Sequence, residues 1–275
     1  MTPRLVLLAV LITAVGLAGR PARAADAAAA PADVPAAAPL PAKDHFKVFL
    51  LVGQSNMAGR GKVEEQDRKP HPRVLSLDKA GKWVPAVDPI HFDKPTIAGV
   101  GLGTTFGRVV ADASPGDTVG LVPCAVGGTS IDEWSPDKPD GLYAAAVRRG
   151  KLALKDGTPA GVLWHQGEAD SSPEKVAAYP AKAAALFAAF RRDLAAPDVP
   201  VVVGGIGEFH GGHERINAAL QAVAAAVPRC GYVAPTGLTD KGDKTHFDAA
   251  SYREFGKRYA AKWAELIKAA GAKAG

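Results

Sequence analysis

The sequence predicts an α/β fold of three layers, in which helices cover both faces of a parallel sheet of five strands. Three observations lead to this prediction. Apolar segments typical of strands alternate with helical segments along the chain, as in consecutive βαβ units. The first strand, Val48–Val52, is apolar throughout, which is typical of a strand buried on both faces. The last helix carries Tyr252, Phe255 and Tyr259 three and four positions apart, so one of its faces is apolar.

The elements follow one another in a regular order. The expected strands are Val48–Val52, Thr118–Pro123, Gly161–Trp164, Val199–Gly204 and Gly231–Pro235. The expected helices are Thr104–Ala113, Leu142–Lys155, Glu174–Leu194, Glu214–Val227 and Ala249–Ala270. The segment from Arg60 to Gly103 interrupts this order, because it is rich in proline, glycine and charge and has only short apolar pieces. We expect it to be an irregular insertion that forms a wall on the substrate side of the sheet.

The N-terminal residues have the composition of an export signal. Arg4 precedes an apolar stretch that runs to about Gly19, and the small residues Ala22 and Ala24 mark a cleavage site. We therefore expect a signal peptide at residues 1–24, an Ala/Pro-rich linker at 25–42 and one domain at 43–275. Export to the periplasm or the medium follows from this division. No other segment is long and apolar enough for an integral membrane domain.

Charge and cysteine content exclude several classes of function. The net charge of +5 falls to +2 when Arg4, Arg20 and Arg23 leave with the signal peptide, which argues against a nucleic-acid partner. Cys124 and Cys230 are expected at opposite edges of the sheet, too far apart for a disulfide. His210 and His213 lack a third ligand, so neither a metal nor another cofactor is expected. The oligomeric state does not follow from the sequence.

A serine and a histidine stand at strand ends where they can meet. Ser55 follows the first strand directly, and Asp243 and His246 follow the last one, three positions apart. The carboxyl ends of parallel strands are where open α/β sheets bind their ligands. An imidazole can take the proton of a serine hydroxyl, and a carboxylate can orient that imidazole. Ser130 is a competing nucleophile, but its position before Ile131-Asp-Glu is more typical of a helix cap.

Two further loops offer donors for an oxyanion. Gly127 and Gly128 follow the second expected strand, where glycine lets a backbone N–H approach a ligand closely. Gln166 follows the third expected strand, and its side-chain amide can donate a hydrogen bond to developing negative charge.

Four short blocks, in order, carry a family resemblance. They are Gly53-Gln-Ser-Asn-Met57, Gly127-Gly-Thr-Ser-Ile131, Trp164-His-Gln-Gly-Glu168 and Asp243-x-x-His246. The chain resembles the SGNH hydrolase superfamily, within it the sialate O-acetylesterase-like branch that includes acetyl xylan esterases of carbohydrate esterase family 6. The resemblance runs from about Lys47 to Tyr259 and implies a flavodoxin-like SGNH hydrolase fold.

The resemblance also implies roles for individual residues. Ser55 is the expected nucleophile, His246 its general base and Asp243 the carboxylate that orients the base. The oxyanion hole is expected from the backbone N–H groups of Ser55 and Gly128 and the side chain of Gln166, although Gly127 is an alternative to Gly128. Residues expected to support the site or to contact substrate are Gln54, Asn56, Gly127, His165 and Glu168.

The expected function is that of an exported, cofactor-independent serine esterase that removes acetyl groups from an acetylated carbohydrate through an acyl-enzyme. The acetyl preference is implied by the resemblance alone. Deacetylation of sialic acids is the alternative within the same class. A carbohydrate-binding domain that has kept the fold and lost turnover is the alternative from another class. The sugar, the hydroxyl position and any sugar platform formed by Trp83, His91 and Trp134 stay open.

Overall fold

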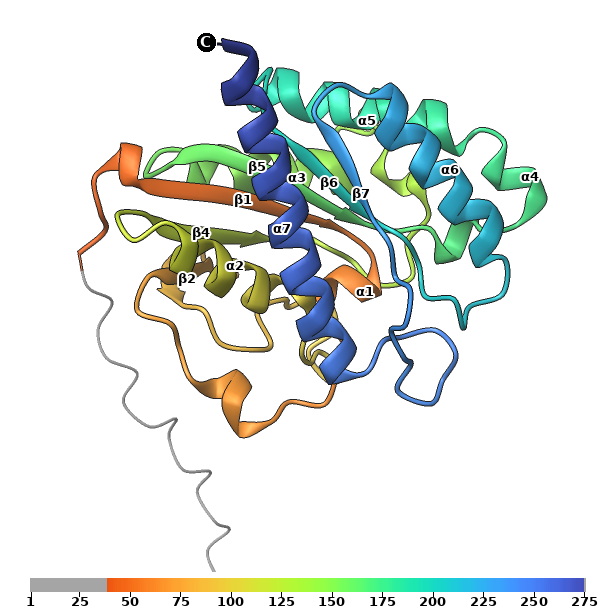
Figure 1. Cartoon of the computed structure of the whole chain (residues 1–275), viewed down its shortest axis with the longest axis horizontal. Coiled ribbons are helices and arrows are strands. Elements are labelled where there is room, and N and C mark those ends of the chain that lie inside the picture. The colour runs from red at the N-terminus through yellow and green to blue at the C-terminus, as the bar shows by residue number, and fades with distance from the viewer. Residues whose placement is uncertain (1–38, 275) are drawn as a thin grey trace, which may run out of the picture. The chain divides into compact units, whose positions relative to one another are not determined.

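A seven-stranded sheet organises the computed structural model, which describes residues 39–274 (Figure 1). The strands are β1 Phe46–Gly53, β2 Val74–Leu77, β3 Trp83–Pro85, β4 Thr118–Pro123, β5 Thr158–His165, β6 Val201–Gly204 and β7 Cys230–Val233. Their order across the sheet is β3-β2-β4-β1-β5-β6-β7. All neighbours are parallel except β2 and β3, which pair antiparallel. The expected signal peptide and the linker up to residue 38 lie outside the described residues.

The helices alternate with the parallel strands. They are α1 Ser55–Ala58, α2 Leu102–Ala113, α3 Leu142–Ala153, α4 Pro173–Val176, α5 Tyr179–Asp193, α6 His213–Ala226 and α7 Ala249–Ala274. Short 3₁₀ turns stand at Lys43–His45, Glu65–Arg68, Ile131–Trp134 and Glu168–Asp170. No helix within residues 39–274 is long and apolar enough to cross a bilayer.

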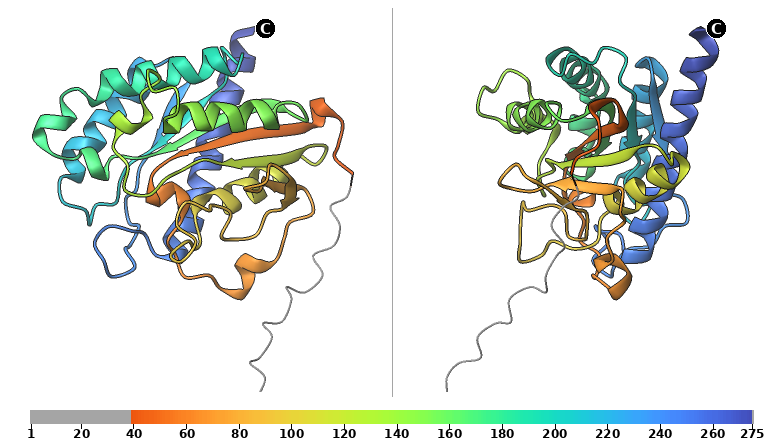
Figure 2. Two further views of the ribbon diagram at one scale, coloured as in Figure 1. Left: turned by 180° about the vertical axis from the view of Figure 1, so that it is seen from behind. Right: turned by 90° about the vertical axis from the view of Figure 1, so that its left-hand side faces the viewer.

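Side chains of β1 alternate between two separate hydrophobic cores. Val48, Leu50 and Val52 pack into one core with side chains of α3, α5 and α6. Phe49 and Leu51 point to the other face of the sheet, where they pack with α2 and α7. Figures 1 and 2 show α2 and α7 on one side of the sheet and α3 and α5 on the other. The predicted three-layer α/β/α class is therefore confirmed, with β1 as its central strand.

The predicted number of five strands is wrong, because the insertion contributes two more. Val74–Leu77 and Trp83–Pro85 form a hairpin, and β2 joins the sheet by parallel pairing with β4. These strands of four and three residues are too short to give a periodic apolar signal. They obtain their stability by extending an existing sheet edge.

The long helix predicted at Glu174–Leu194 is also wrong, because the chain forms two helices there. The short α4 ends at Val176, and α5 begins at Tyr179 with Pro180 in its first turn. Proline lacks the N–H that a continuous helix would need at this position, whereas a first turn leaves that group unused. The expectation of unpaired cysteines is confirmed, with Cys230 buried and Cys124 partly buried.

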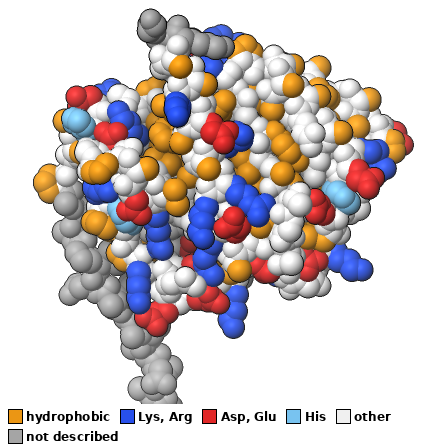
Figure 3. Space-filling model, viewed as in Figure 1, with side chains coloured by type: hydrophobic (Ala, Val, Ile, Leu, Met, Phe, Trp, Pro, Cys, Tyr) orange, Lys and Arg blue, Asp and Glu red, His pale blue; other side chains and the backbone are white. Residues whose placement is uncertain are grey.

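Charged side chains of both signs are interspersed on the face of the molecule in Figure 3. This distribution contains no continuous basic stripe on that face, which agrees with the small net charge.

Candidate active site

A tight turn at the end of β1 places Ser55 at the carboxyl edge of the sheet. Gly53 has a φ of 127°, and a Cβ atom built there would lie 2.1 Å from the carbonyl oxygen of His165. Only glycine fits such a position. The Gln54 N–H then donates to that same carbonyl at 2.9 Å, and α1 begins at Ser55. The turn thus fixes the serine against the end of the neighbouring strand β5.

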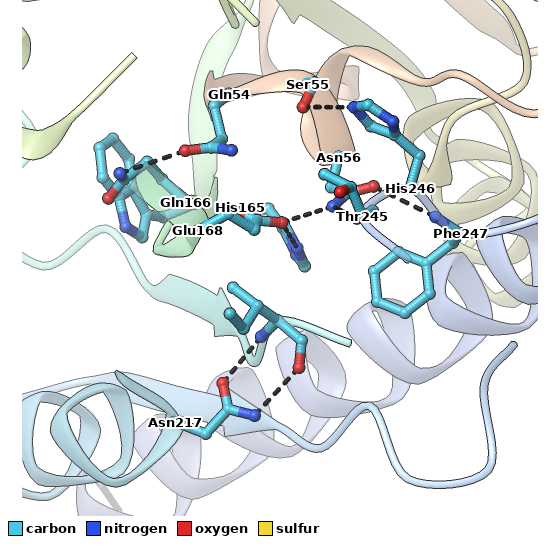
Figure 4. A network of polar contacts seen from close by, with 12 residues as sticks. Gln54, Ser55, Asn56, His165, Gln166, Glu168, Asn217, Thr245, His246 and Phe247 are labelled. Atoms are coloured by element: carbon cyan, nitrogen blue, oxygen red, sulfur yellow. Dashed lines mark hydrogen bonds and ion pairs between the residues drawn. The ribbon is translucent and has the colours of Figure 1, made fainter. Parts of the chain in front are cut away.

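Ser55, His246 and Asp243 form a continuous hydrogen-bonded chain. Figure 4 shows its first contact, between Ser55 and His246. The Ser55 hydroxyl lies 2.9 Å from His246 Nε2, and His246 Nδ1 lies 2.7 Å from Asp243 Oδ2. A carboxylate can only accept, so Nδ1 carries the proton and Nε2 is free to accept from the serine. The structure therefore brings together the three residues that the sequence placed at two distant strand ends.

The loop after β7 holds this carboxylate and imidazole in register. Asp243 Oδ1 accepts the backbone N–H groups of Thr245 at 3.0 Å and His246 at 2.8 Å. The loop closes on itself, because the Lys241 N–H donates to the carbonyl of His246 at 2.9 Å. Burial opposes ionisation of Asp243, but the hydrogen bonds from the backbone and ring of His246 hold its pKa well below the usual range. Asp243 is therefore ionised at neutral pH.

Asn56 connects the serine turn to the histidine loop. Its Nδ2 donates to the carbonyl oxygen of Thr245 at 2.9 Å and also to the carboxyl of Glu168. Its Oδ1 accepts from the Tyr252 hydroxyl at 2.5 Å. The Asn56 side chain is fully buried, so its amide is itself shielded from water. Asn56 is thus a support between nucleophile and base, as expected, and not a group open to substrate.

Glu168 and His165 form a buried pair next to Asn56 (Figure 4). Burial raises the pKa of Glu168 to about 7 and lowers the pKa of His165 to about 3. The two side chains are 3.8 Å apart, yet both directions favour their neutral forms, so the contact is not an ion pair at mildly acidic pH. Glu168 accepts from Asn56, and His165 Nδ1 lies 3.1 Å from the Tyr259 hydroxyl. Within the described residues, neither side chain is hydrogen-bonded to the Ser55 hydroxyl, which contacts His246.

Gln166 does not occupy the position expected of a direct oxyanion donor. Its side chain is completely buried, and its Nε2 lies 3.2 Å from Gln54 Oε1, 3.1 Å from the Thr129 carbonyl and 2.5 Å from Asp170 Oδ2. Two N–H hydrogens facing three protein acceptors leave no free donor. The expectation for Gln166 therefore disagrees with the structure. The resemblance implied Gln166 as the donor, and the sequence does not show that Thr129 and Asp170 surround its amide.

Gln54 is the amide that Gln166 orients (Figure 4). Its Oε1 accepts from Gln166, and no hydrogen bond joins its Nε2 to an acceptor within the described part of the chain. The backbone N–H of Ser55 and that of Gly128 likewise have no acceptor in residues 39–274. Three donors near the serine are thus available to a ligand.

A buried ion pair distinguishes Gly127 from Gly128. Asp93 accepts from Arg60 at 2.6 Å and from the Gly127 N–H at 2.8 Å, and the two charged side chains are each 1% exposed. Burial alone would raise the pKa of Asp93, but the Arg60 guanidinium and the Gly127 N–H lower it. Gly127 is therefore engaged, whereas Gly128, with φ of 85°, keeps its N–H unengaged by the described residues.

Arg60 and Asp93 were not predicted as site residues. They belong to the irregular insertion, 33 positions apart, and no motif marks them. Charged residues are common in such a segment, so only their burial identifies this pair.

Other residues considered from the sequence lie outside the site. Trp134 and His91 are buried, and the Trp83 indole packs on Phe46 at 4.7 Å, so these three residues form no exposed sugar platform. The Ser130 N–H donates to Glu133 at 2.7 Å, which agrees with a helix cap. His213 Nδ1 lies 2.8 Å from the His210 carbonyl. Within the described residues, no three His, Cys, Asp or Glu side chains cluster in a way that could hold a metal ion.

Comparison with known proteins places this site in a family. The chain is 31% identical over 230 residues to a probable carbohydrate esterase of Arabidopsis thaliana, which covers 76% of this chain and 87% of the plant protein. The solved structure of an Arabidopsis thaliana protein superposes with a TM-score of 0.74 at 29% identity, over 80% of this chain and 98% of that one. NanS superposes with a TM-score of 0.67 at 20% identity, over 83% and 99% of the two chains, and shares the fold.

The family profile leads to the same assignment. The sequence model described as carbohydrate esterase, sialic acid-specific acetylesterase matches residues 45–265, which include all four predicted sequence blocks. The resemblance inferred from those blocks is therefore confirmed, and with it the SGNH-type fold. The chain belongs to the carbohydrate esterase, sialic acid-specific acetylesterase family.

Proposed function

We propose that this chain is an exported serine esterase that removes O-acetyl groups from an acetylated carbohydrate through an acetyl-enzyme. One observation carries the proposal: His246 Nε2 lies 2.9 Å from Ser55 Oγ while its Nδ1 lies 2.7 Å from Asp243. Membership of a carbohydrate esterase family supports the carboxylic ester as the bond that is cleaved. The complete serine–histidine–aspartate chain favours turnover over a binding-only domain.

The first half of the reaction forms the acetyl-enzyme. Ser55 Oγ attacks the ester carbonyl while its proton moves to His246 Nε2, and the carbonyl oxygen becomes an oxyanion. We assign the N–H groups of Ser55, Gly128 and the Gln54 amide to that oxyanion, because none has an acceptor in the described residues. His246 then gives its proton to the departing sugar oxygen as the carbon–oxygen bond breaks.

The second half releases acetate. A water molecule gives a proton to His246 Nε2 and attacks the acetyl carbonyl, and the same three donors face the second oxyanion. Collapse breaks the bond to Ser55 Oγ, which recovers its proton from His246. Asp243 stays ionised throughout and stabilises the imidazolium, consistent with its lowered pKa.

The test is acetate release from acetylated sugars by the wild-type protein and by Ser55→Ala. The proposal expects rapid release that Ser55→Ala abolishes, poor hydrolysis of butyryl and longer esters, and an acetylated serine trapped after rapid acid quench. Ser130→Ala is the matched control. Because Ser130 caps a 3₁₀ turn, this variant should retain the wild-type activity. Activity that survives in Ser55→Ala would assign the nucleophile to another residue, and a folded but inactive wild type would favour the binding-domain alternative.

Export is part of the proposal and rests on the sequence of residues 1–24. N-terminal sequencing of the protein recovered outside the cytoplasm should begin at Ala25. Recovery of the uncleaved chain from the cytoplasm alone would contradict export and leave the esterase proposal untouched.

A further inference from the structure

One cation of the insertion lies at the entrance to the candidate active site. The side of Gly128 that a Cβ atom would occupy is open. Among residues 39–274, apart from the two neighbours of Gly128 in the chain, Lys94 Nζ is the one heavy atom within 4 Å of that position, at 3.8 Å. Gly128 is the residue whose N–H is assigned to the oxyanion. The Lys94 side chain therefore reaches the rim where the ester would lie.

The backbone that carries Lys94 is attached to the site at both ends. On one side, Asp93 is bonded to Arg60 and to the Gly127 N–H. On the other side, the Gly99 N–H donates to the Gly59 carbonyl at 3.2 Å.

Between these anchors the segment forms a turn. The N–H groups of Ile97 and Ala98 both bond to the Lys94 carbonyl, at 3.0 and 2.9 Å. Lys94 is thus not on a freely moving loop, because its backbone is fixed relative to Ser55 and Gly128.

The Lys94 ammonium has no partner in residues 39–274. No carboxylate lies within 4.0 Å of its Nζ, no hydrogen bond is made by it, and the residue is exposed. Asp93, its neighbour in sequence, is engaged with Arg60 and Gly127 and is 1% exposed. An unpaired cation held at a ligand entrance raises the local concentration of anionic ligands.

We propose that Lys94 binds a carboxylate on the sugar part of the substrate, so that acetylated acidic sugars are preferred over neutral ones. The inference rests on the proposed function. In an acetyl ester the acyl part offers only a methyl group, so any anion that meets Lys94 belongs to the sugar. Lysine acts here as a point charge beside an exposed rim, which predicts a modest contribution that salt screens.

The experiment compares two acetylated sugars that differ in one group. O-Acetyl glucuronate carries a carboxylate, and O-acetyl glucuronamide carries a neutral amide of nearly the same shape. The measured quantity is the ratio of their kcat/KM values for acetate release at low and high ionic strength. We expect the wild type to prefer the acid by about three- to fivefold at low salt, which corresponds to the upper part of the range for an exposed ion pair.

Lys94→Gln should bring this ratio close to one, and Lys94→Glu should invert it. Lys155→Gln is the matched control, because this exposed lysine precedes β5 at the opposite edge of the sheet and should keep the wild-type ratio. A ratio unaffected by Lys94→Gln would overturn the inference. Equal losses on both substrates would also overturn it, since Lys94 would then act on the reacting ester itself.

A second acid distinguishes the source of the carboxylate. O-Acetyl N-acetylneuraminate places its carboxylate differently from the glucuronate. For each acid, kcat/KM is compared with that of the neutral glucuronamide, and the acid whose ratio falls more in Lys94→Gln has the carboxylate better placed for Lys94. The glucuronate ratio decides the inference, and the neuraminate result reports only which of the two acids fits Lys94 better. Failure of the proposed function has a different signature, namely no acetate release from any of the three substrates.

Discussion

Asn56 Nδ2 donates to the carbonyl oxygen of Thr245 at 2.9 Å, so the residue after the nucleophile is bonded to the residue before the base. The two loops come from opposite ends of the chain, 189 positions apart. Their relative position determines the distance between Ser55 Oγ and His246 Nε2. A misplacement of this kind is costly, because catalysis depends on alignment at the scale of an ångström.

We predict that Asn56→Ala lowers kcat by about ten- to a hundredfold, with a smaller change in KM. Loss of the side chain leaves the Thr245 carbonyl and the Glu168 carboxyl without this donor, at about 1–3 kcal/mol for each buried unsatisfied group. The measurement is steady-state kinetics together with thermal unfolding.

The control for Asn56 is Asn217→Ala. Asn217 is also a buried asparagine that bonds two backbone groups, the N–H and carbonyl of Ile206, but it has no bond to the serine or histidine loops (Figure 4). It should lose stability while kcat stays near the wild-type value. If both variants lose kcat to the same extent, the effect of Asn56 comes from general destabilisation and not from loop alignment.

The buried Glu168 predicts that stability depends on pH. An ordinary glutamate loses its proton near pH 4.5, whereas folded Glu168 keeps it to about pH 7. Between these values unfolding releases a proton, so rising pH favours the unfolded chain. The loss in the free energy of unfolding grows from pH 4.5 to about pH 7 and is constant at higher pH. It reaches about 3 kcal/mol in total for a pKa shift of this size.

Glu168→Gln removes the titration and keeps an amide of similar shape. The difference in unfolding free energy between this variant and the wild type should therefore move in favour of glutamine as pH rises from 5 to 8. Denaturant unfolding at several pH values measures it. Glu214→Gln, at an exposed position of α6, should give a flat difference. A flat difference for Glu168→Gln as well would mean that Glu168 is ionised in the folded protein at acidic pH.

The sequence predicts those parts of the site that depend on local motifs. Gly53 and Ser55 stand where an apolar strand ends, so their place at the carboxyl edge follows from strand topology. Asp243 and His246 are three positions apart on one loop, so their contact can be predicted without knowing the rest of the fold.

Features that depend on long-range packing were not predicted. The pairing of Arg60 with Asp93 depends on how an irregular insertion folds back, for which hydrophobic periodicity gives no signal. The burial of the Gln166 amide depends on the acceptors that surround it: Asp170 lies four positions along the same loop, but Thr129 comes from the loop after β4. Strands β2 and β3 are stable only because the edge beside β4 is open to them.

We predict that Asp243→Asn lowers kcat by about 10³- to 10⁴-fold. An asparagine amide can donate to His246 Nδ1, which would favour the tautomer whose Nε2 carries a proton and cannot accept from Ser55. Asp240→Asn is the control on the same loop, since Asp240 accepts the N–H groups of Gly242 and Lys244 and has no bond to His246. Kinetics at fixed pH should separate the two, and equal losses would show that loop folding, not the tautomer, was affected.

The assignment of the oxyanion amide gives the last prediction. Gln54→Leu keeps the side-chain volume and removes the free Nε2, so kcat should fall by about 10²- to 10³-fold with little change in KM, as for other single oxyanion donors. Gln166→Leu should also lower kcat, because Gln54 would lose the bond from Gln166 Nε2 at 3.2 Å that orients it.

The double variant separates orientation from direct donation. If Gln166 acts only through Gln54, the losses are not additive, and Gln54→Leu with Gln166→Leu is no slower than Gln54→Leu alone. Gln66→Leu, at an exposed position of the insertion, controls for the loss of an amide as such. Wild-type kcat in Gln54→Leu combined with a large loss in Gln166→Leu would return the donor role to Gln166, and would require its amide to leave the Thr129 and Asp170 acceptors during the reaction.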